Sequence, residues 1–142
     1  MYKRQLEDAG HRLQERQLCP DDRYQIRREL SRWIADPAVD VVITSGGTGL
    51  TGRDGTPEAV APLLDKTIEG FGELFRVLSF ESIGTSTLQS RCLAGVANGT
   101  FVFVLPGSLD AVTTAWNRLI RAQLDADTRP CNLAQLRARL KE

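Results

Sequence analysis

Two short apolar runs constrain the fold of this chain more than any other feature of its sequence. Val39–Thr44 is rich in β-branched residues, and Phe101–Leu105 is wholly apolar. Runs of this kind, without regular polar alternation, are typical of strands that are buried on both faces of a parallel sheet. Segments with helical spacing surround them, so the sequence predicts an α/β fold.

The predicted helices follow from the spacing of apolar residues and from capping residues. After Asp22, four apolar residues recur at i, i+4, i+7 and i+8, and Asp36-Pro37 ends the pattern. They are Ile26, Leu30, Trp33 and Ile34. The other expected helices are one capped by Thr56 with Pro57, Val60, Leu63 and Leu64, a turn with Phe75 and Leu78, one capped by Ser108 with Val112, Ala115, Trp116, Leu119 and Ile120, and a last one with Leu133, Leu136 and Leu140.

The first twenty residues give a weaker pattern. Leu6 and Ala9 ahead of Gly10 predict the end of a helix with a glycine cap. Residues 11–19 are predicted as a strand, although residues 14–17 make it a polar one. We set residues 1–5 apart as an uninformative leader and assign residues 6–142 to a single domain, since this length is typical of one domain.

Charge and composition narrow the classes of partner and location. Lys and Arg number 18, as do Asp and Glu, so the chain lacks the positive field expected of a nucleic-acid binder. Fifteen of the cationic residues are Arg, which suits phosphate and carboxylate groups. The chain has no apolar run near 18 residues and no export signal, and its three cysteines have no disulfide or zinc spacing. We therefore expect a cytoplasmic protein that does not bind nucleic acid or membranes.

A glycine-rich loop follows the first predicted strand. Thr44–Pro57 contains five glycines together with Arg53 and Asp54, and glycines let the backbone approach an anion closely. Because ligands of open α/β sheets bind outside the carboxyl ends of strands, this loop and Pro106-Gly107-Ser108 are predicted to form one cleft for an anionic ligand. The alternative is that the glycines merely build a tight turn.

Two known phosphate-binding patterns fit the loop poorly. The Gly-Lys-Ser/Thr ending of a Walker A motif is absent. Gly47, Gly49 and Gly52 match G-x-G-x-x-G, but Pro57 places the helix start five residues after the last of them. In a dinucleotide-binding fold the third glycine packs inside the helix, so a nicotinamide-binding domain is disfavoured.

The full spelling of the loop resembles the signature of the MoaB/MogA molybdenum-cofactor biosynthesis family. The resemblance covers about residues 6–132, and its last three stretches are similar to the MoaB branch in particular. The matching stretches are Ile43–Gly49, Gly52–Ala59, Glu69–Glu73, Ser90-Arg91, Leu105–Ser108, Leu78–Glu81, Ile83–Thr87 and Thr128–Asn132. A match of this length and spread is specific.

The resemblance implies a three-layer α/β sandwich around a mostly parallel sheet, as in MogA. It also implies that the protein binds molybdopterin and ATP, forms trimers or hexamers, and transfers AMP from Mg-ATP to molybdopterin with release of pyrophosphate. By the same resemblance Asp54 and Asp21 are the catalytic acids. Because carboxylates usually hold the Mg²⁺ in such reactions, Asp54 is the expected Mg²⁺ ligand. The expected substrate-binding residues are Gly46, Gly47, Thr48, Gly49, Arg53, Ser90, Arg91, Pro106, Gly107 and Ser108.

Several of these residues have a structural alternative. Asp21 or Asp22 can cap the helix that follows, and Asp54 can brace its own turn. Arg91 can pair with a surface acid, and Ser108 can act as a helix cap.

The sequence also departs from the family. The family begins with a strand and a Ser/Asp-rich loop, and neither is found before the first helix here, so we expect little or no turnover from the 142 residues as they stand. Leu109-Asp110 stands where the family often has Pro-Lys. The alternative function is pterin binding or scaffolding in the same pathway, without catalysis. Self-association is predicted through the apolar run Phe71–Ile83, in particular through Phe71, Phe75 and Phe80.

Overall fold

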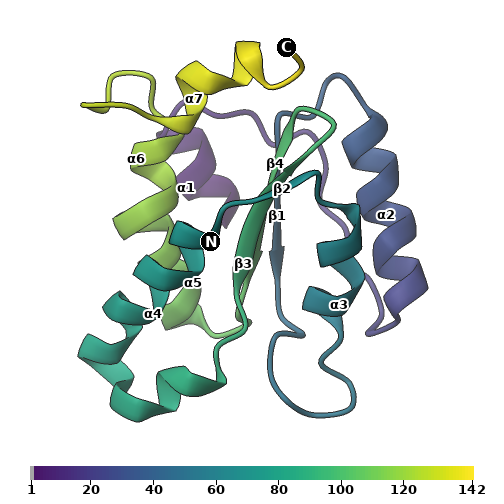
Figure 1. Ribbon diagram of the computed structural model, residues 1–142, viewed down its shortest axis with the longest axis vertical. Coiled ribbons are helices and arrows are strands. Elements are labelled where there is room, and N and C mark those ends of the chain that lie inside the picture. The colour runs from purple at the N-terminus through teal and green to yellow at the C-terminus, as the bar shows by residue number, and fades with distance from the viewer. Residues whose placement is uncertain (1) are drawn as a thin grey trace.

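A four-stranded sheet with the strand order β1-β4-β3-β2 forms the middle layer of the computed structural model, which describes residues 2–142 (Figure 1). β1 (Val41–Ser45) and β4 (Thr100–Leu105) are parallel, as predicted. β3 (Leu93–Ala97) is antiparallel to β4, and β2 (Lys66–Thr67) is antiparallel to β3. The sheet is therefore mixed rather than mostly parallel. The reason is the tight turn Asn98-Gly99, whose two residues have φ of 48° and 77° and join β3 to β4 as a hairpin.

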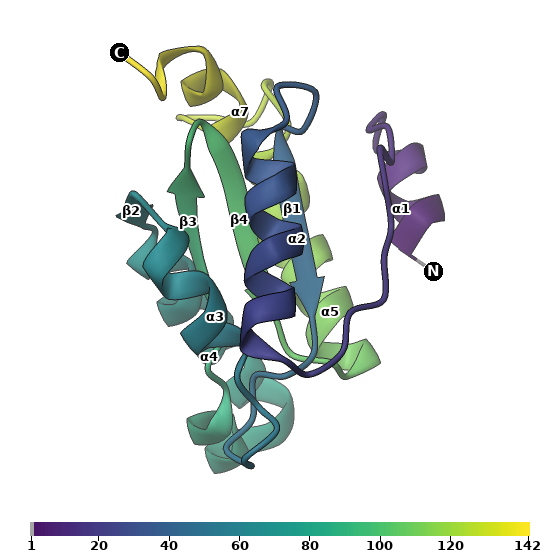
Figure 2. The same cartoon turned by 90° about the vertical axis from the view of Figure 1, so that its right-hand side faces the viewer.

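Helices cover both faces of the sheet and complete the three layers (Figures 1 and 2). One face carries α2 (Arg23–Ala35) and α3 (Thr56–Val60). The other face carries α1 (Tyr2–Asp8), α4 (Glu69–Ile83), α5 (Leu109–Ala115) and α6 (Arg121–Gln123), with a π-helical turn between α5 and α6, and α7 (Leu133–Leu136) lies near one end of the sheet. Across residues 2–142, no helix has the length and apolar character needed to span a bilayer.

β4 lies at the centre of the hydrophobic core, and all six of its residues are buried. Its side chains alternate between two clusters, because successive residues of a strand point to opposite faces of a sheet. Phe101, Phe103 and Leu105 pack with α4 and α5 on one face, and Val102 and Val104 pack with α2 and α3 on the other. This arrangement confirms the α/β sandwich and the double burial that the apolar run predicts.

Most predicted helices are found, with small changes at their ends. α2 begins after Asp22, whose carboxylate accepts hydrogen bonds from the backbone N–H groups of Tyr24 and Gln25. Thr56 is the first residue of α3 rather than its cap, since Gly55 occupies the cap position. The predicted turn at residues 75–78 is part of the longer helix α4, and the helices after Ser108 and after residue 130 are confirmed.

The outer face of α4 is apolar, but it differs from the predicted association surface. Phe71 and Phe75 are buried in the core, so that part of the prediction is wrong. They face inward because their side chains pack on the sheet, where the ring of Phe71 lies edge-on to that of Phe103 at 5.3 Å. The exposed hydrophobic residues of α4 are Leu74, Val77, Phe80 and Ile83, which are between 49% and 63% exposed.

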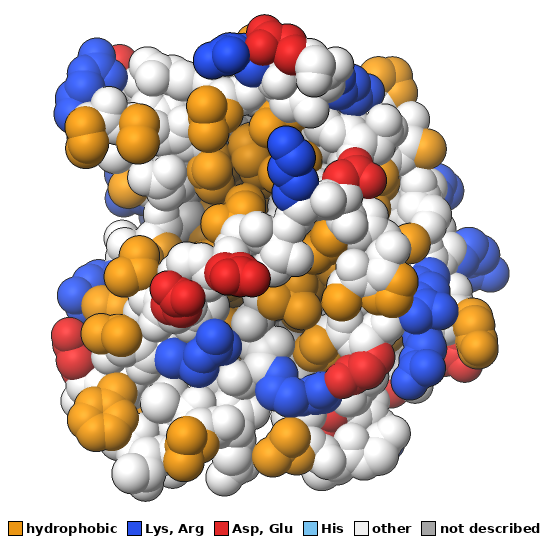
Figure 3. Space-filling view, in the orientation of Figure 1, with side chains coloured by type: hydrophobic (Ala, Val, Ile, Leu, Met, Phe, Trp, Pro, Cys, Tyr) orange, Lys and Arg blue, Asp and Glu red, His pale blue; other side chains and the backbone are white. Residues whose placement is uncertain are grey.

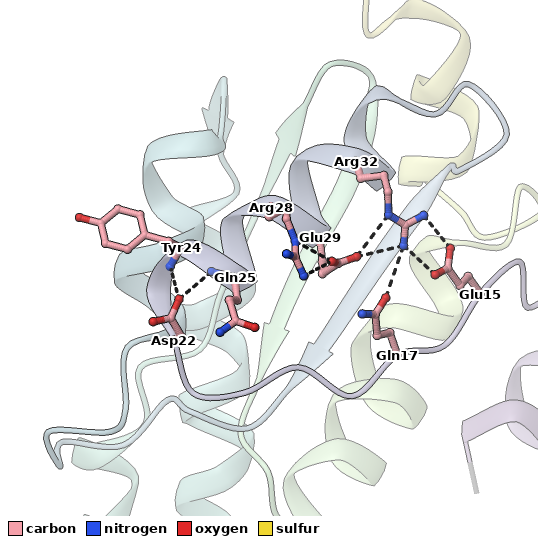
Figure 4. A network of polar contacts seen from close by, with 8 residues as sticks. All are labelled: Glu15, Gln17, Asp22, Tyr24, Gln25, Arg28, Glu29 and Arg32. Atoms are coloured by element: carbon pink, nitrogen blue, oxygen red, sulfur yellow. Dashed lines mark hydrogen bonds and ion pairs between the residues drawn. The ribbon is translucent and has the colours of Figure 1, made fainter.

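The prediction of a strand at residues 11–19 is wrong. This segment is extended and runs beside β1 in Figure 2, but a groove of about 670 Å³ separates it from that strand, so no backbone ladder forms. Side chains tether the segment to α2 instead (Figure 4). The Glu15 carboxylate accepts hydrogen bonds from Arg32 Nη1 and from Trp33 Nε1, both at 2.9 Å. The bond from Arg32 lowers the pKa of Glu15.

Candidate functional site

The glycine loop and the Pro106–Ser108 loop meet at one edge of the sheet. They follow β1 and β4, and the carboxyl ends of these parallel strands lie side by side. The Gly46 N–H donates to the Leu105 carbonyl at 2.9 Å, and the Ser45 hydroxyl donates to the Pro106 carbonyl at 3.3 Å. A Cβ atom placed on Gly107 would lie 3.3 Å from Gly46 Cα. The sequence predicts this meeting of the two loops, and the structure confirms it.

Gly46 and Gly47 require glycine because both have a positive φ, 105° and 68°, and Gly49 is closely packed. Gly47 has a φ of +68°, and a side chain there would collide with the side chain of Thr56, whose N–H donates to the Gly47 carbonyl at 3.1 Å. At Gly49, a Cβ atom would lie 2.7 Å from Asp54 Oδ2. Thr48, between these two glycines, is buried. The glycines therefore do build a tight turn, and that turn brings the backbone of the loop against Asp54.

Asp54 has a carboxylate that is fixed within the loop. Its Oδ2 atom accepts a hydrogen bond of 2.6 Å from the Thr51 hydroxyl and one of 2.9 Å from the Thr51 N–H. These bonds lower the pKa of Asp54, because they favour the charged form. The predicted bracing role is thus observed, and it leaves an ionised carboxylate at a defined place.

Arg91 reaches the same loop from the segment that precedes β3. Its Nε donates to the Gly49 carbonyl at 2.8 Å, and its Nη2 donates to the Asp54 carbonyl at 2.7 Å. Nη1 forms an ion pair with the Glu58 carboxylate, and this bond lowers the pKa of Glu58. The alternative that Arg91 pairs with an acid is therefore correct. The sequence interpretation assigned no role to Glu58, although its place in the first turn of α3, directly after the loop, was a usable signal.

A second arginine fixes α3 from the other side. Arg27 of α2 donates through Nε to the Ala59 carbonyl at 3.1 Å and through Nη2 to the Glu58 carbonyl at 2.9 Å. Helix α3, which follows the glycine loop, is therefore held by both Arg27 and Arg91. No sequence pattern indicated this contact.

Asp21 lies beside the loop and not at the helix cap, which Asp22 occupies. Arg53 Nη2 lies 3.5 Å from Asp21 Oδ2, and both side chains are exposed. Asp21 also lines one end of the groove next to β1, together with Gly46 and Gly47. Asp54 and Arg91 do not line that groove, so the predicted site residues fall into two adjoining groups.

The two predicted serines differ in their surroundings. Ser108 is exposed, and its hydroxyl accepts a hydrogen bond of 3.2 Å from the Ala111 N–H, which makes it the cap of α5. Ser90 is half-buried next to Arg91, and its carbonyl accepts from Arg76 Nη1 at 3.5 Å. Ser108 therefore stands at the shared edge, whereas Ser90 is half-buried on the segment that carries Arg91.

Together these features define a class of protein. It is a three-layer α/β domain in which two loops, one of them rich in glycine, meet at the carboxyl ends of a parallel strand pair beside an ionised aspartate and an exposed arginine. Such edges bind small, often phosphorylated ligands.

The comparisons with known proteins identify the family. Residues 1–126 match the model described as "Probable molybdopterin binding domain". The chain belongs to this family of molybdenum cofactor biosynthesis proteins. It is 56% identical over 126 residues to molybdenum cofactor biosynthesis protein B of Escherichia coli (strain K12), an alignment that covers 89% of this chain and 74% of that protein. It is 46% identical over 120 residues to the protein of the same name from Bacillus cereus, covering 84% and 71%.

Solved structures agree with this assignment. One crystal structure of a molybdenum cofactor biosynthesis protein B superposes with a TM-score of 0.83 at 44% identity and covers 87% of this chain and 77% of that one. The tungsten cofactor synthesizing protein MoaB from Pyrococcus furiosus superposes with a TM-score of 0.69 at 40% identity and covers 80% and 72%. The resemblance to the MoaB/MogA family and the fold that it implies are confirmed.

Proposed function

We propose that this protein binds molybdopterin where the glycine loop meets the Pro106–Ser108 loop, and that it transfers AMP from ATP to molybdopterin. The main support is the convergence of the two loops at one sheet edge, with the ionised carboxylate of Asp54 held inside the longer loop. The family assignment supplies the ligand class.

The proposed reaction exchanges one phosphoanhydride linkage for another. An oxygen of the molybdopterin phosphate attacks the α-phosphorus of ATP, the new P–O bond forms, and the bond from the α-phosphorus to the bridging oxygen breaks. Pyrophosphate leaves with the electron pair of that bond. The protein has little covalent work in such a step, so positioning and compensation of phosphate charge carry the catalysis.

Each proposed residue has a defined part in this positioning. Backbone N–H groups of Gly47 and Thr48 bind phosphate oxygens, since the Gly46 N–H already donates to the Leu105 carbonyl. Arg53, an exposed residue of the same loop, adds positive charge. Asp21 orients the Arg53 side chain through their ion pair. The Pro106–Ser108 loop forms the opposite wall of the cleft.

A magnesium ion that arrives with ATP fits Asp54. Mg²⁺ on a nucleotide commonly takes one or two protein carboxylates and completes its shell with phosphate oxygens and water. The Asp54 carboxylate is kept ionised and in place by Thr51, so it can serve as such a ligand. When bound, the ion neutralises charge on the phosphates.

The test measures both products of the reaction. The 142-residue chain, and a form extended by a first strand of the kind that the resemblance implies, are incubated with molybdopterin, ATP and Mg²⁺. Pyrophosphate and adenylylated molybdopterin in equal amounts from the extended form support AMP transfer. Binding of molybdopterin without pyrophosphate favours the non-catalytic pterin-binding alternative, and the absence of binding contradicts both functions.

We also propose that copies of this chain associate through α4. Figure 3 shows hydrophobic side chains emerging on the side of the molecule where α4 lies. The exposed hydrophobic residues of α4 are Leu74, Val77, Phe80 and Ile83, each about half exposed or more. Apolar patches of this kind mark interfaces in soluble proteins, and trimers or hexamers are the assemblies that the family resemblance implies.

A further inference from the structure

Arg91 spans the tip of the glycine loop. Gly49 begins this tip and Asp54 ends it, and the two carbonyls accept hydrogen bonds from two different nitrogen atoms of the one guanidinium group. The planar fork of arginine can bridge two acceptors in this way, whereas the single ammonium of lysine cannot hold both at once in a fixed geometry. The contact therefore closes residues 49–54 into a ring.

The third contact of Arg91 compensates its charge. The Glu58 carboxylate pairs with Nη1, and Glu58 is itself fixed because Arg27 binds its carbonyl. The Arg91 side chain is only 27% exposed. An arginine that is paired with a carboxylate and directed at two backbone carbonyls has little unpaired charge for a phosphate group. Arg53, whose side chain is 86% exposed, is the better placed cation.

Arg91 also connects the loop to the antiparallel half of the sheet. It lies just before β3, and β3 pairs with β4 through the Asn98-Gly99 hairpin. The loop itself follows β1, on the other side of β4. The guanidinium group thus couples the loop to a rigid element that is distant in sequence.

We propose that Arg91 is a positioning residue and not a substrate ligand. It holds the carbonyls of Gly49 and Asp54, and in this way it fixes the place of the Asp54 carboxylate. Glu58 is the partner that keeps Arg91 in position. The functional part of this inference rests on the proposed binding of a phosphorylated substrate, whereas the clamping of the loop does not.

The two hydrogen bonds from Arg91 to the Gly49 and Asp54 carbonyls are called the clamp below. The first measurement tests the clamp without any ligand. The Thr51 N–H donates to the Asp54 carboxylate, so its hydrogen exchange reports whether the loop tip is closed. Exchange at Thr51 should be at least about tenfold faster in Arg91→Lys and Arg91→Met, since a lost charge-assisted contact is commonly worth a factor of this order. Arg139→Met, which removes an exposed contact to Glu142 far along the chain, is the matched control and should leave the rate unchanged. Wild-type protection of Thr51 in Arg91→Lys would overturn the proposal.

The second measurement separates positioning from direct binding by whether the affinity for ATP rises or falls in the variants. Calorimetric titration with ATP and Mg²⁺ should show weaker affinity for Arg91→Lys, by about tenfold, and also for Glu58→Gln, by about threefold. If Arg91 were a phosphate ligand, the lysine variant would retain most of the affinity, and removing the competing carboxylate in Glu58→Gln would strengthen it. Either result contradicts the positioning role.

The two measurements also separate this inference from the proposed function. If the wild type binds neither ATP nor molybdopterin, the proposed function fails, and the exchange rate of Thr51 alone decides the clamp. If the wild type binds ATP and both arginine variants bind it equally well while their loops exchange faster, the site stands and the positioning role is refuted. Thermal unfolding of each variant confirms that it is folded.

Discussion

The Thr51 hydroxyl and the Thr51 N–H both donate to the same oxygen atom of Asp54, at 2.6 Å and 2.9 Å. Two donors on one carboxylate oxygen fix the plane of the carboxylate and favour its charged form. An aspartate held in this way acts at a constant position and with a constant charge at neutral pH. The first two predictions depend on this arrangement.

Asp54→Asn should reduce turnover far more than affinity. The amide keeps the size of the side chain but loses the negative charge, and removal of one preorganised electrostatic contact commonly lowers turnover roughly 10²–10³-fold. Affinity for molybdopterin should change less than about threefold, because the backbone N–H groups of Gly47 and Thr48 remain. Pyrophosphate release from the extended form, with a binding titration, gives both values. Asp127→Asn, an exposed substitution, is the control, and full turnover by Asp54→Asn would show that the catalytic carboxylate is another residue.

Gly49→Ala should displace the Asp54 carboxylate. The added Cβ would lie 2.7 Å from Oδ2, and the carboxylate is the flexible end of its side chain, so it can move away at the expense of the Thr51 contacts. We expect a loss of about 1 kcal/mol of stability and a larger loss of turnover. Gly52→Ala in the same loop is the matched control, since a Cβ atom there has no heavy atom within 4 Å. Chemical denaturation and pyrophosphate release measure the two effects, and equal behaviour of the two alanine variants would contradict the prediction.

Acid should destabilise the protein partly through Glu58. Its pKa is lowered in the folded state by Arg91, so folding favours the ionised form. This contribution to stability is fully present above the pKa of the unfolded chain, about 4.3, and it is lost as pH falls through the lower folded pKa. Denaturation midpoints of the wild type should therefore fall more steeply below about pH 4 than those of Glu58→Gln. Identical slopes for the two proteins would show that the ion pair is too weak to matter.

Charges placed on the outer face of α4 should prevent the proposed self-association. Phe80→Glu and Val77→Glu replace exposed apolar side chains that do not contribute to the core, so each variant should fold and run as a monomer. Light scattering at micromolar concentration gives the mass of each form. Leu136→Glu, an exposed substitution on α7, should keep the wild-type mass. A monomeric wild type, or variants that assemble normally, would rule out this surface.

Elements with a strong local pattern could be predicted from the sequence alone. α2 has an unbroken apolar stripe and an aspartate cap, and β4 has five apolar residues in a row, so local and tertiary preferences agree. β3 escaped prediction because Leu93–Ala97 is short and contains Ala and Gly, which gives it no strand pattern of its own. Residues 11–19 were predicted as a strand but do not form one. A strand also needs a partner for its backbone hydrogen bonds, and composition does not show whether such a partner lies nearby.

Part of the candidate site could also be predicted from the sequence, and part of it could not. The meeting of the Gly46–Gly49 and Pro106–Ser108 loops follows from strand direction, which the sequence pattern indicates. The contacts of Arg91 depend on two carbonyl groups more than 35 residues away in the chain. Backbone carbonyls have no sequence signature, so the clamp was visible only in three dimensions.

The parallel pairing of β1 with β4 makes the site a late product of folding. The Asn98-Gly99 hairpin closes a local contact and should form early. The ladder of β1 with β4 joins residues as far apart as Val41 and Phe101, so we expect it to form later. The glycine loop and the Pro106–Ser108 loop come together only when that ladder is complete. Recovery of molybdopterin binding, where it is observed, should therefore follow the slowest refolding phase, after most helical structure has returned. Chains that stall before this phase would be helical but would lack the assembled loops.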